Sequence, residues 1–500
     1  MVAPSVIRAA TEVEGELADR AAAYPRVAWE VHDRTHLEAN VVYPLAEGVE
    51  HHRCGWEAFF VAPESFQLST VPNLPGQFLT RVRRAVPSER FDTLSGAPLA
   101  ELEQVLTEGV GVERRLRLFA CLVKRTVVST IARLDSQLDD PAGVAAARRE
   151  LECAQRLARE VHLLLASDDD DELAVARHGA DEYISLSIEG FFEAVALALK
   201  DRASPEPLAE EAVASAVAEA RYRRERGYES VLVSSAPARE VERYDLWRHA
   251  LKRQVSSVLW LTMSDRQPRR WARHVLYGMA AALAMAFAVA AAIWNGTNPA
   301  DRLASWLLVA VLAYAGKDRL KASLQGYLGD KLLRRLPNHR WTLRDPDSGD
   351  ALGAVDEHTR LVDWDEVPDT VERCQPDGWG DDLTLALPQY ALRHAKTMTL
   401  DGRTVHRDDE PYRGVVEVCR VDLSRWLAHT DDPKRDVQFA DPDAGEIVVQ
   451  KAARVYDVLL CCRAWAEGAP DSPWQCLRVV VSRKGILRID RLDGDRGCAC

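Results

Sequence analysis

Two long apolar runs dominate the hydrophobic pattern of this chain, one from Val275 to Trp294 and one from Leu303 to Ala315. The first carries no charge, and as a helix it is about 30 Å long, close to the thickness of a bilayer's hydrocarbon core. The second is shorter and suits a buried core helix equally well. Because only a short polar loop separates the runs, we expect a two-helix transmembrane hairpin. The alternatives are a single crossing, a re-entrant second limb and a buried hairpin in a soluble protein.

Basic residues flank this hairpin on its outer sides, whereas the loop at 295–302 holds one Arg and one Asp. The positive-inside rule then predicts a cytoplasmic (inner) membrane protein with both arms in the cytosol and the loop outside. The acidic N-terminus has no uninterrupted apolar core, so the first run is also the expected targeting signal. The residues expected to set the topology are Arg266, Arg269, Arg270, Arg273, Lys317, Arg319 and Lys321.

Small residues recur every four positions along the first run, at Gly278, Ala282, Ala286 and Ala290. Such a stripe allows two helix backbones to approach closely. We expect it to pack either against a second copy of the chain or against the second limb of the same hairpin. The lipid bilayer is thus one partner, and a homo-oligomer or a membrane partner protein is the other expected one.

The N-terminal half divides into two parts by the period of its apolar residues. Residues 1–98 predict a short helix followed by a small antiparallel sheet, because apolar residues alternate over 27–31 and 37–43 and fill 54–61. Residues 99–264 predict a cytoplasmic helical bundle. Its expected helices cover 99–134, 142–165, 183–199 and 208–226, with a further helix over 238–263 that leads toward the membrane.

The C-terminal half begins with the membrane segment, residues 265–336, in which 317–336 forms an amphipathic helical extension ended by Pro337. Residues 337–500 predict a mostly antiparallel β domain with a minor helix over 423–429. Its expected strands are 414–421, 446–450, 453–462, 477–482 and 485–489. The fold class predicted for the whole chain is therefore an α+β membrane protein.

Charge and cysteine content narrow the function classes. The 500 residues have a net charge of -13, which argues against nucleic-acid binding because that requires a concentrated basic face. The ten cysteines include no CxxC pair, and cytosolic arms would keep them reduced. A thiolate metal site could be built from Cys461, Cys462, Cys476, Cys498 and Cys500. We interpret the adjacent pair as small core residues instead.

The first predicted hairpin offers one candidate metal site. If residues 33–35 form its turn, His32 pairs with His36 and Glu30 pairs with Glu38, on the face opposite Trp29. Two opposed carboxylates repel each other across strands unless a divalent cation lies between them. The hypothesis is a two-His, two-Glu site, and the alternative is an ordinary solvated sheet face.

The sequence carries none of the common catalytic signatures: it has no glycine-rich phosphate loop, no Gly-x-Ser-x-Gly elbow and no His-Glu-x-x-His helix. We therefore expect a non-enzymatic scaffold or sensor held at the membrane. Two alternatives stay open. One is an oligomeric membrane effector or pore former, and the other is a membrane-tethered enzyme that uses the metal site.

Overall fold

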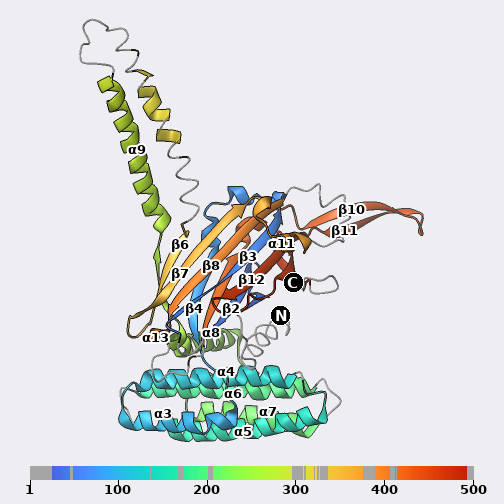
Figure 1. Cartoon of the computed structure of the whole chain (residues 1–500). Helices are drawn as coiled ribbons and strands as arrows, with labels where there is room; N and C mark the ends of the chain where they lie inside the picture. The colour runs from blue at the N-terminus through green and yellow to red at the C-terminus, as the bar shows by residue number, and fades with distance from the viewer. Residues whose placement is uncertain are drawn as a thin grey trace.

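The computed structural model has an α+β architecture in which a β-sandwich lies between a helical bundle and one long projecting helix (Figure 1). It describes residues 25–45, 49–135, 137–166, 173–200, 206–294, 336–374, 389–405, 412 and 414–492. Between 294 and 336 it describes residues 308, 311, 312, 314–319, 321–323 and 326, all of which are helical.

The smaller sheet has four strands, and it combines the two ends of the chain. Its order is β1-β2-β9-β4, and every pairing is antiparallel. The strands are β1 (Arg26–Val31), β2 (His36–Pro44), β9 (Gly414–Asp422) and β4 (Phe78–Ala85). A C-terminal strand thus lies between two N-terminal ones.

The larger sheet has eight antiparallel strands in the order β14-β13-β12-β3-β8-β7-β6-β5. They are β14 (Gly485–Arg491), β13 (Gln475–Ser482), β12 (Tyr456–Ala466), β3 (His51–Pro63), β8 (Gln389–Asp401), β7 (Ala351–Val362), β6 (His339–Arg344) and β5 (Thr262–Arg266). N-terminal β3 lies between C-terminal β12 and β8, so both sheets form only when the two halves of the chain come together.

The two sheets face each other across one hydrophobic core. Alternate residues of β3, such as Trp56 and Phe60, point into it and are fully buried. The edges of the two sheets come close on both sides of the sandwich. On one side Leu261 donates a backbone hydrogen bond of 2.9 Å to Val82, and on the other Ile486 donates one of 2.6 Å to Arg34. The sandwich therefore approaches a flattened barrel, which leaves little free strand edge.

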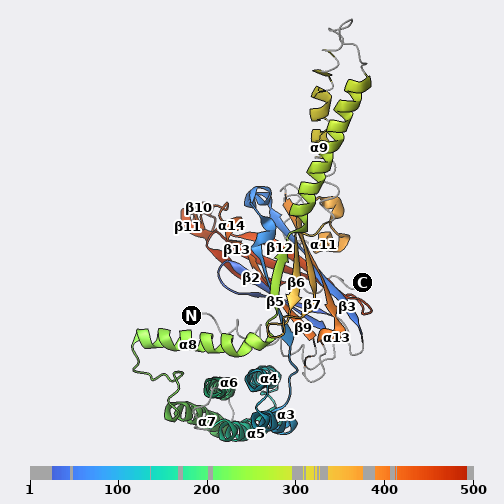
Figure 2. The same ribbon diagram turned by 90° about the vertical axis from the view of Figure 1, so that its left-hand side faces the viewer.

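The helical bundle lies on the side of the sandwich away from the projecting helix (Figure 2). Its helices are α3 (Ala97–Glu108), α4 (Val112–Asp135), α5 (Pro141–Leu165), α6 (Ala174–Lys200), α7 (Glu206–Glu225) and α8 (Ala238–Ser256). The predicted helix over 99–134 is two helices, because Gly109 and Gly111 both adopt positive φ. The predicted helix over 238–263 ends at Ser256, and β5 follows it.

The projecting helix is α9 (Pro268–Trp294), which is inserted between β5 and β6. These two strands are antiparallel neighbours, with Arg266 opposite Arg340. The chain therefore leaves the sheet and returns to it at the same end. In the described part of the chain, α9 is the one helix long and apolar enough to span a membrane, over Trp271–Ala290.

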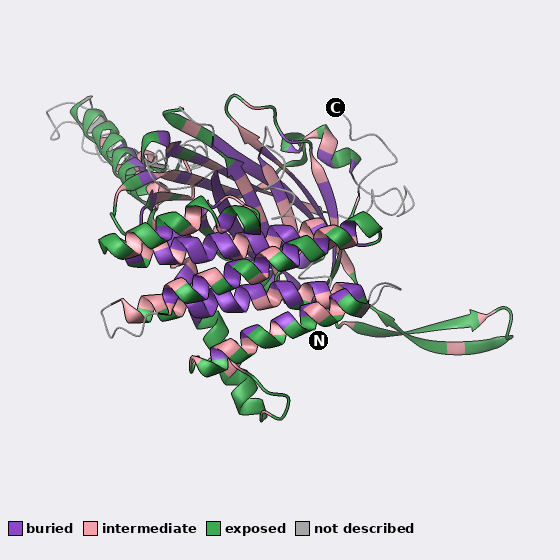
Figure 3. Ribbon diagram, turned by 90° about the horizontal axis from the view of Figure 1, so that it is seen from below, coloured by how far each residue is buried: buried purple, intermediate pink, exposed green. Residues whose placement is uncertain are grey.

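A two-stranded ribbon of β10 (Lys434–Asp441) and β11 (Glu446–Ala453) extends to the side of the sandwich. Figure 3 shows that this ribbon is almost wholly exposed. The remaining short helices are α2 (Phe91–Leu94), α11 (Asp369–Arg373), α13 (Gly402–Val405) and α14 (Ser424–Leu427). The helix expected over 423–429 corresponds to α14.

The coarse prediction of the fold class is confirmed: an N-terminal antiparallel sheet, a helical middle and C-terminal antiparallel sheets. The sheets do not follow the predicted division at 98 and 337, because their strands interleave. The transmembrane hairpin itself is not shown, since one candidate span is found and most of 303–315 lies outside the described residues. The expected N-terminal helix and the loop at 295–302 also lie outside them.

Candidate functional site

The surface of α9 is the clearest functional feature of the molecule. The helix extends away from the sandwich in both side views, and only 17% of its apolar window is buried (Figures 1 and 2). The exposed large apolar side chains on it are Trp271, Val275, Tyr277, Met279, Leu283, Met285, Phe287, Val289 and Ile293. Monomeric soluble proteins rarely expose a continuous apolar surface of this kind, so the surface of α9 is a candidate site of contact with lipid or with another protein.

One narrow face of α9 is buried within the chain. It is formed by Leu276, Ala280 and Ala284, of which the two alanines are 0% and 1% exposed. The predicted small-residue stripe of Gly278, Ala282, Ala286 and Ala290 is exposed. At 100° per residue, positions two apart lie on nearly opposite sides of a helix. The stripe therefore faces away from the buried face, and its packing against a partner stays a prediction.

The chain after residue 294 returns along α9. A Cβ atom placed on Gly316 would lie 3.3 Å from the ring of Phe287. Nearer the sandwich, the Arg269 Nε donates a 2.7 Å hydrogen bond to the Leu336 carbonyl. From Arg269 to Phe287 along α9, the neighbouring residue changes from Leu336 back to Gly316. Such opposite numbering over a similar length is expected of two antiparallel helices of equal rise. The return segment therefore runs antiparallel to α9.

This register moves some of the residues expected to set the topology. Arg269 and Arg273 lie near the base of α9. Lys317, however, follows Gly316 directly and so lies level with Phe287, about 18 Å along the helix from Val275. Arg319 and Lys321 come within the next turn. The cationic flank of the second limb thus lies beside the middle of α9 and not at its base.

The predicted metal site has the expected strand register. Glu30 is the direct partner of Glu38, and the His32 amide donates a 3.0 Å hydrogen bond to the His36 carbonyl across the turn. The side chains, however, do not converge. The ring of His36 turns to Asp33, with Nδ1 2.9 Å from a carboxylate oxygen.

Local side chains of the protein contact the two facing carboxylates. Glu38 accepts a 2.6 Å hydrogen bond from Arg420 and lies 3.3 Å from His32. The amide of Asn40 bridges Glu30 and Glu38 at 3.3 Å and 3.4 Å. Arg420 belongs to β9, which the sequence did not place beside this hairpin. The metal site stays a prediction, and the observed contacts favour the solvated sheet face.

A charged cluster lies inside the sandwich. The Lys396 Nζ is 2.7 Å from Glu417 Oε1, and both side chains are essentially unexposed, at 1% and 0%. Trp56 and Tyr43 each donate a 3.1 Å hydrogen bond to Glu417 Oε2. The nearby carboxylates and the Cys419 sulfur outweigh burial and raise the pKa of Lys396. Both side chains of the pair are therefore hydrogen-bonded inside the core.

Two further titratable groups adjoin this cluster. Burial raises the pKa of Glu357, and burial with the charge of Lys396 lowers the pKa of His394 well below its usual value. The Thr359 hydroxyl is 2.7 Å from His394 Nδ1, and the His394 ring stacks on Phe78. Within the described residues, neither Glu357 Oε1 nor His394 Nε2 has a hydrogen-bond partner. These groups form the most polar part of the core.

The helical bundle contains a second buried network, centred on His162. Its Nδ1 is 2.6 Å from Asp181, and its Nε2 is 3.1 Å from Glu219. Burial would lower the pKa of His162, but the two carboxylates outweigh it and raise that pKa to about 9. Tyr222 and Tyr228 donate hydrogen bonds of 2.7 Å and 2.6 Å to Asp181. This network joins α5, α6 and α7.

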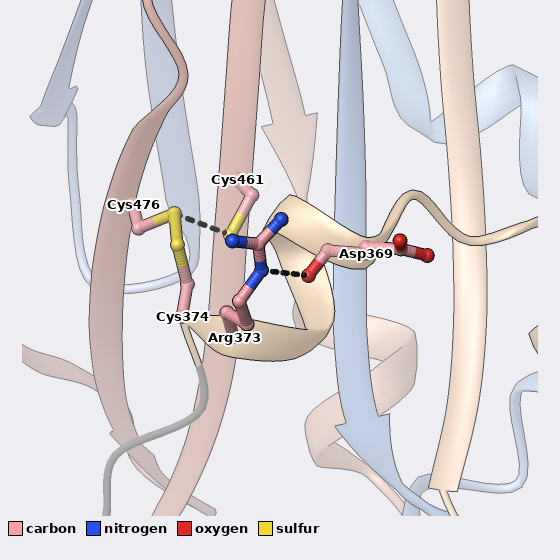
Figure 4. The surroundings of a disulfide bond; sticks show 5 residues. All are labelled: Asp369, Arg373, Cys374, Cys461 and Cys476. Carbon is pink, nitrogen blue, oxygen red and sulfur yellow. Dashed lines mark hydrogen bonds between the residues drawn. A yellow bond between two sulfur atoms is a disulfide. The ribbon is translucent and has the colours of Figure 1, made fainter. Parts of the chain in front are cut away.

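A group of three cysteines lies on the outer face of the larger sheet. Cys374 and Cys476 form a disulfide, and the Cys461 Sγ lies 2.9 Å from Cys476 Sγ (Figure 4). The expectation that all cysteines are reduced therefore differs from the structure. Within the described ranges, this is the one group of three potential metal ligands, and its ligand atoms all lie within 4.8 Å of one another.

The sequence held partial signals for these clusters. Cys461 and Cys476 were recognised as potential ligands, but Cys374 was not, because no spacing rule connects it to them. Lys396 is two residues before Met398, and Glu417 is two residues after Val415, so each charged residue shares a strand face with apolar residues. Their pairing depends on how the two sheets face each other, and a single sequence does not reveal that.

Comparison of the chain with protein-family models, with curated proteins and with solved structures finds no match.

Proposed function

We propose that this protein is a non-enzymatic scaffold or sensor anchored in the cytoplasmic membrane, with its sandwich and helical bundle in the cytosol. The observation that carries the proposal is the insertion of an apolar, outward-pointing helix between two paired strands. Since β5 and β6 are neighbours in one sheet, they lie on one side of a membrane. If α9 enters the bilayer, the chain must come back, which favours a hairpin over a single crossing.

The orientation follows from the charges at the base of α9. Arg266, Arg269, Arg270 and Arg273 gather where the helix meets the sandwich. Basic residues beside a span remain on the cytoplasmic side. The sandwich continues directly from this base, and the bundle lies beyond it (Figure 2). The loop at 295–302 would then be the only segment to reach or approach the outer surface.

Reporter fusions test this topology. Green fluorescent protein fused after residue 500 is expected to fluoresce, and alkaline phosphatase fused at the same place is expected to be inactive, because the C-terminal arm is cytosolic. A phosphatase inserted at residue 298 is expected to be active if the hairpin crosses fully. Active phosphatase at the C-terminus contradicts the proposal. Inactive phosphatase at 298 together with a cytosolic C-terminus indicates a re-entrant hairpin.

The β10–β11 ribbon supports a scaffold that self-associates, and we propose a second copy of the chain as its partner. Within the described residues, no strand pairs with either outer edge of the ribbon, and a two-stranded ribbon alone is only marginally stable. Its exposed side chains include Val437, Phe439, Ile447 and Val449. These features are typical of a strand-addition surface.

The charges of the ribbon are complementary to those of a reversed copy. Its base carries Lys434, Arg435 and Lys451 with one acidic residue, Asp436, whereas its tip carries Asp441, Asp443 and Glu446. The ribbon runs across the direction of α9 and therefore along the plane of the membrane (Figure 1). A two-fold axis along the membrane normal reverses such a ribbon. The base of one ribbon then meets the tip of the other while both copies remain anchored in the same bilayer.

A pore is the second candidate, and one contact favours it. Gly316 beside Phe287 brings Lys317, Asp318 and Arg319 level with the middle of an apolar helix. Charged residues at membrane depth are costly and commonly line a polar path. Ion flux from vesicles containing the purified protein tests this candidate. A flux whose ion selectivity changes in a Lys317→Glu variant supports a pore, whereas tight vesicles support the anchor.

A further inference from the structure

Cys374, Cys461 and Cys476 come from three separate elements and meet at one point. Cys374 ends α11, and the other two are direct register partners on β12 and β13. Figure 4 shows the three sulfurs pointing toward one another. A disulfide accounts for two of them, and the third lies 2.9 Å from Cys476 Sγ. Three converging sulfurs are one more than a disulfide requires.

The spacing and the surroundings suit a thiophilic metal ion. Zinc–sulfur bonds of about 2.3 Å place tetrahedral thiolates about 3.8 Å apart. The Cys461 and Cys476 sulfurs are 2.9 Å apart and Cys374 is bonded to Cys476, so the three sulfurs reach that spacing by separating slightly once the disulfide is reduced. The cysteines are buried beside Phe59, Val61 and Leu459. An uncompensated thiolate is unfavourable in such an apolar site, and a bound cation removes that cost.

The proposed membrane topology decides between a disulfide and a metal. It places β12 and β13 in the cytosol, where disulfides are rare because thiols are kept reduced. We infer that Cys374, Cys461 and Cys476 form a structural zinc site in the reduced protein. This inference rests on the cytosolic position of the sandwich. Its consequence is that zinc fastens α11 to the outer face of the larger sheet.

The reaction that loads the site balances in two steps. A cellular dithiol transfers two electrons and two protons to the Cys374–Cys476 bond; this yields two thiols, and the dithiol becomes a disulfide. Zinc(II) then displaces the protons of three thiols, which pass to solvent, and no electron reaches the metal. Zinc affinity is therefore expected to fall as the pH is lowered, because protons compete for the thiolates.

Three thiolates are the ligands that the described residues supply. Cys498 and Cys500, two further cysteines that the sequence offered for such a site, lie outside the described residues.

Zinc content of the full-length protein, purified in detergent with a reductant and without chelators, tests the inference. Wild type is expected to hold about one zinc per chain by elemental analysis. Cys461→Ser is expected to lose most of it. Cys461 is the informative position because the disulfide does not include it, so a cluster that serves only as a disulfide would be unaffected by the change.

Cys462→Ser is the matched control. Cys462 is the next residue of the same strand and equally buried, but it faces the core between the sheets, where Trp29 donates to its sulfur. This variant is expected to keep its zinc.

Two results would overturn the zinc site: wild type without zinc, or Cys461→Ser with as much zinc as wild type. Alkylation of thiols in intact cells, followed by mass spectrometry, would then show the Cys374–Cys476 bond. The reporter fusions separate this failure from that of the proposed function. A cytosolic C-terminus without zinc contradicts the zinc site alone, whereas an external C-terminus contradicts the topology on which it rests.

Discussion

Lys396 and Glu417 place two opposite charges at the centre of the β-sandwich, where neither reaches solvent. Removing one charge from a buried pair leaves the other uncompensated, which typically costs about 3–5 kcal/mol. We therefore expect Lys396→Met to lower the free energy of unfolding by about that amount. Denaturant unfolding in detergent, followed by tryptophan fluorescence, measures the loss because Trp56 hydrogen-bonds to Glu417.

The matched control removes both charges. In Lys396→Met with Glu417→Gln, the amide oxygen still accepts hydrogen bonds from Trp56 and Tyr43, and no net charge remains buried. This double variant is expected to recover most of the stability that the single variant loses. If the single variant loses less than about 1 kcal/mol, the pair does not contribute to the core in the way its geometry indicates.

His162 makes the stability of the helical bundle depend on pH. Its pKa rises from 6.5 to about 9 because Asp181 and Glu219 stabilise the protonated ring despite burial. The folded state therefore holds this proton more tightly than the unfolded state. The resulting stabilisation is fully present below pH 6.5 and is lost as the pH rises through about 9. Burial and Asp181 raise the pKa of Tyr222 above its usual value, so Tyr222 stays neutral over this range.

The variant that tests this proton is His162→Gln, which keeps hydrogen-bonding capacity but cannot take up the charge. The gap in unfolding free energy between wild type and variant is expected to be large near pH 6.5 and small above pH 9. A gap that is constant with pH would show that His162 acts by packing alone. Helical circular dichroism is the suitable readout because α5, α6 and α7 share the network.

Local pattern predicted some of these residues and not others. The register of Glu30 opposite Glu38 follows from alternation and turn length, which are local properties, and it is confirmed. The ion pair between Glu38 and Arg420 depends on β9, which lies far away in the sequence. The Lys396–Glu417 pair and the position of Cys374 have the same origin: each is set by contacts between elements distant in the sequence.

The two alanine faces of α9 allow a paired test at the level of the element. Ala284 is buried at 1% exposure on the side of the return segment, whereas Ala286 is exposed. Ala284→Leu is expected to overpack the buried face of α9 and destabilise its packing by about 1–3 kcal/mol without changing the oligomer mass. Ala286→Leu is expected to change the oligomer mass in detergent. If Ala286→Leu leaves the oligomer mass unchanged, the small-residue stripe contacts lipid and does not join copies of the chain.

The β10–β11 ribbon can be shortened along its own register. Arg435 is opposite Ala452, so deleting 436–451 and joining these two residues by an Asn-Gly turn preserves the base of the ribbon. This variant is expected to sediment as a smaller species than wild type, with the same circular dichroism and thermal midpoint apart from the lost strands. If the shortened variant keeps the full oligomer mass, the chain self-associates through another surface.

Sequence pattern located the helices of the bundle better than the strands of the sandwich. The predicted helices over 142–165 and 208–226 agree with α5 and α7 to within a few residues, because helical periodicity is a local property. Strands β7 and β8 were missed. Their buried faces carry Glu357, His394 and Lys396, so the alternation expected of a half-buried strand is broken by charge.

At the scale of the whole molecule, the sandwich is one unit into which two segments are inserted. The helical bundle follows β4 and precedes β5, and α9 with its return segment lies between β5 and β6. The sequence predicted these segments as successive domains because its pattern changes at their boundaries. It could not show that β9 enters the first sheet or that β3 enters the second, since such pairings leave no local signal.

This nested order makes the segment that contains α9 separable from the rest. Because Arg266 and Arg340 are paired neighbours, residues 268–337 can be replaced by a short Gly-Asn-Gly turn that converts β5 and β6 into an ordinary hairpin. We expect the shortened protein to fold, to keep the circular dichroism of its sheets and bundle, and to move from the membrane to the soluble fraction. The control variant joins Asp441 to Glu446 by an equivalent turn at the ribbon tip and leaves α9 intact. This control protein is expected to stay with the membrane. If the excised protein still sediments with membranes while folded, its anchor lies elsewhere in the chain, and the outward apolar surface of α9 serves a protein partner in place of the bilayer.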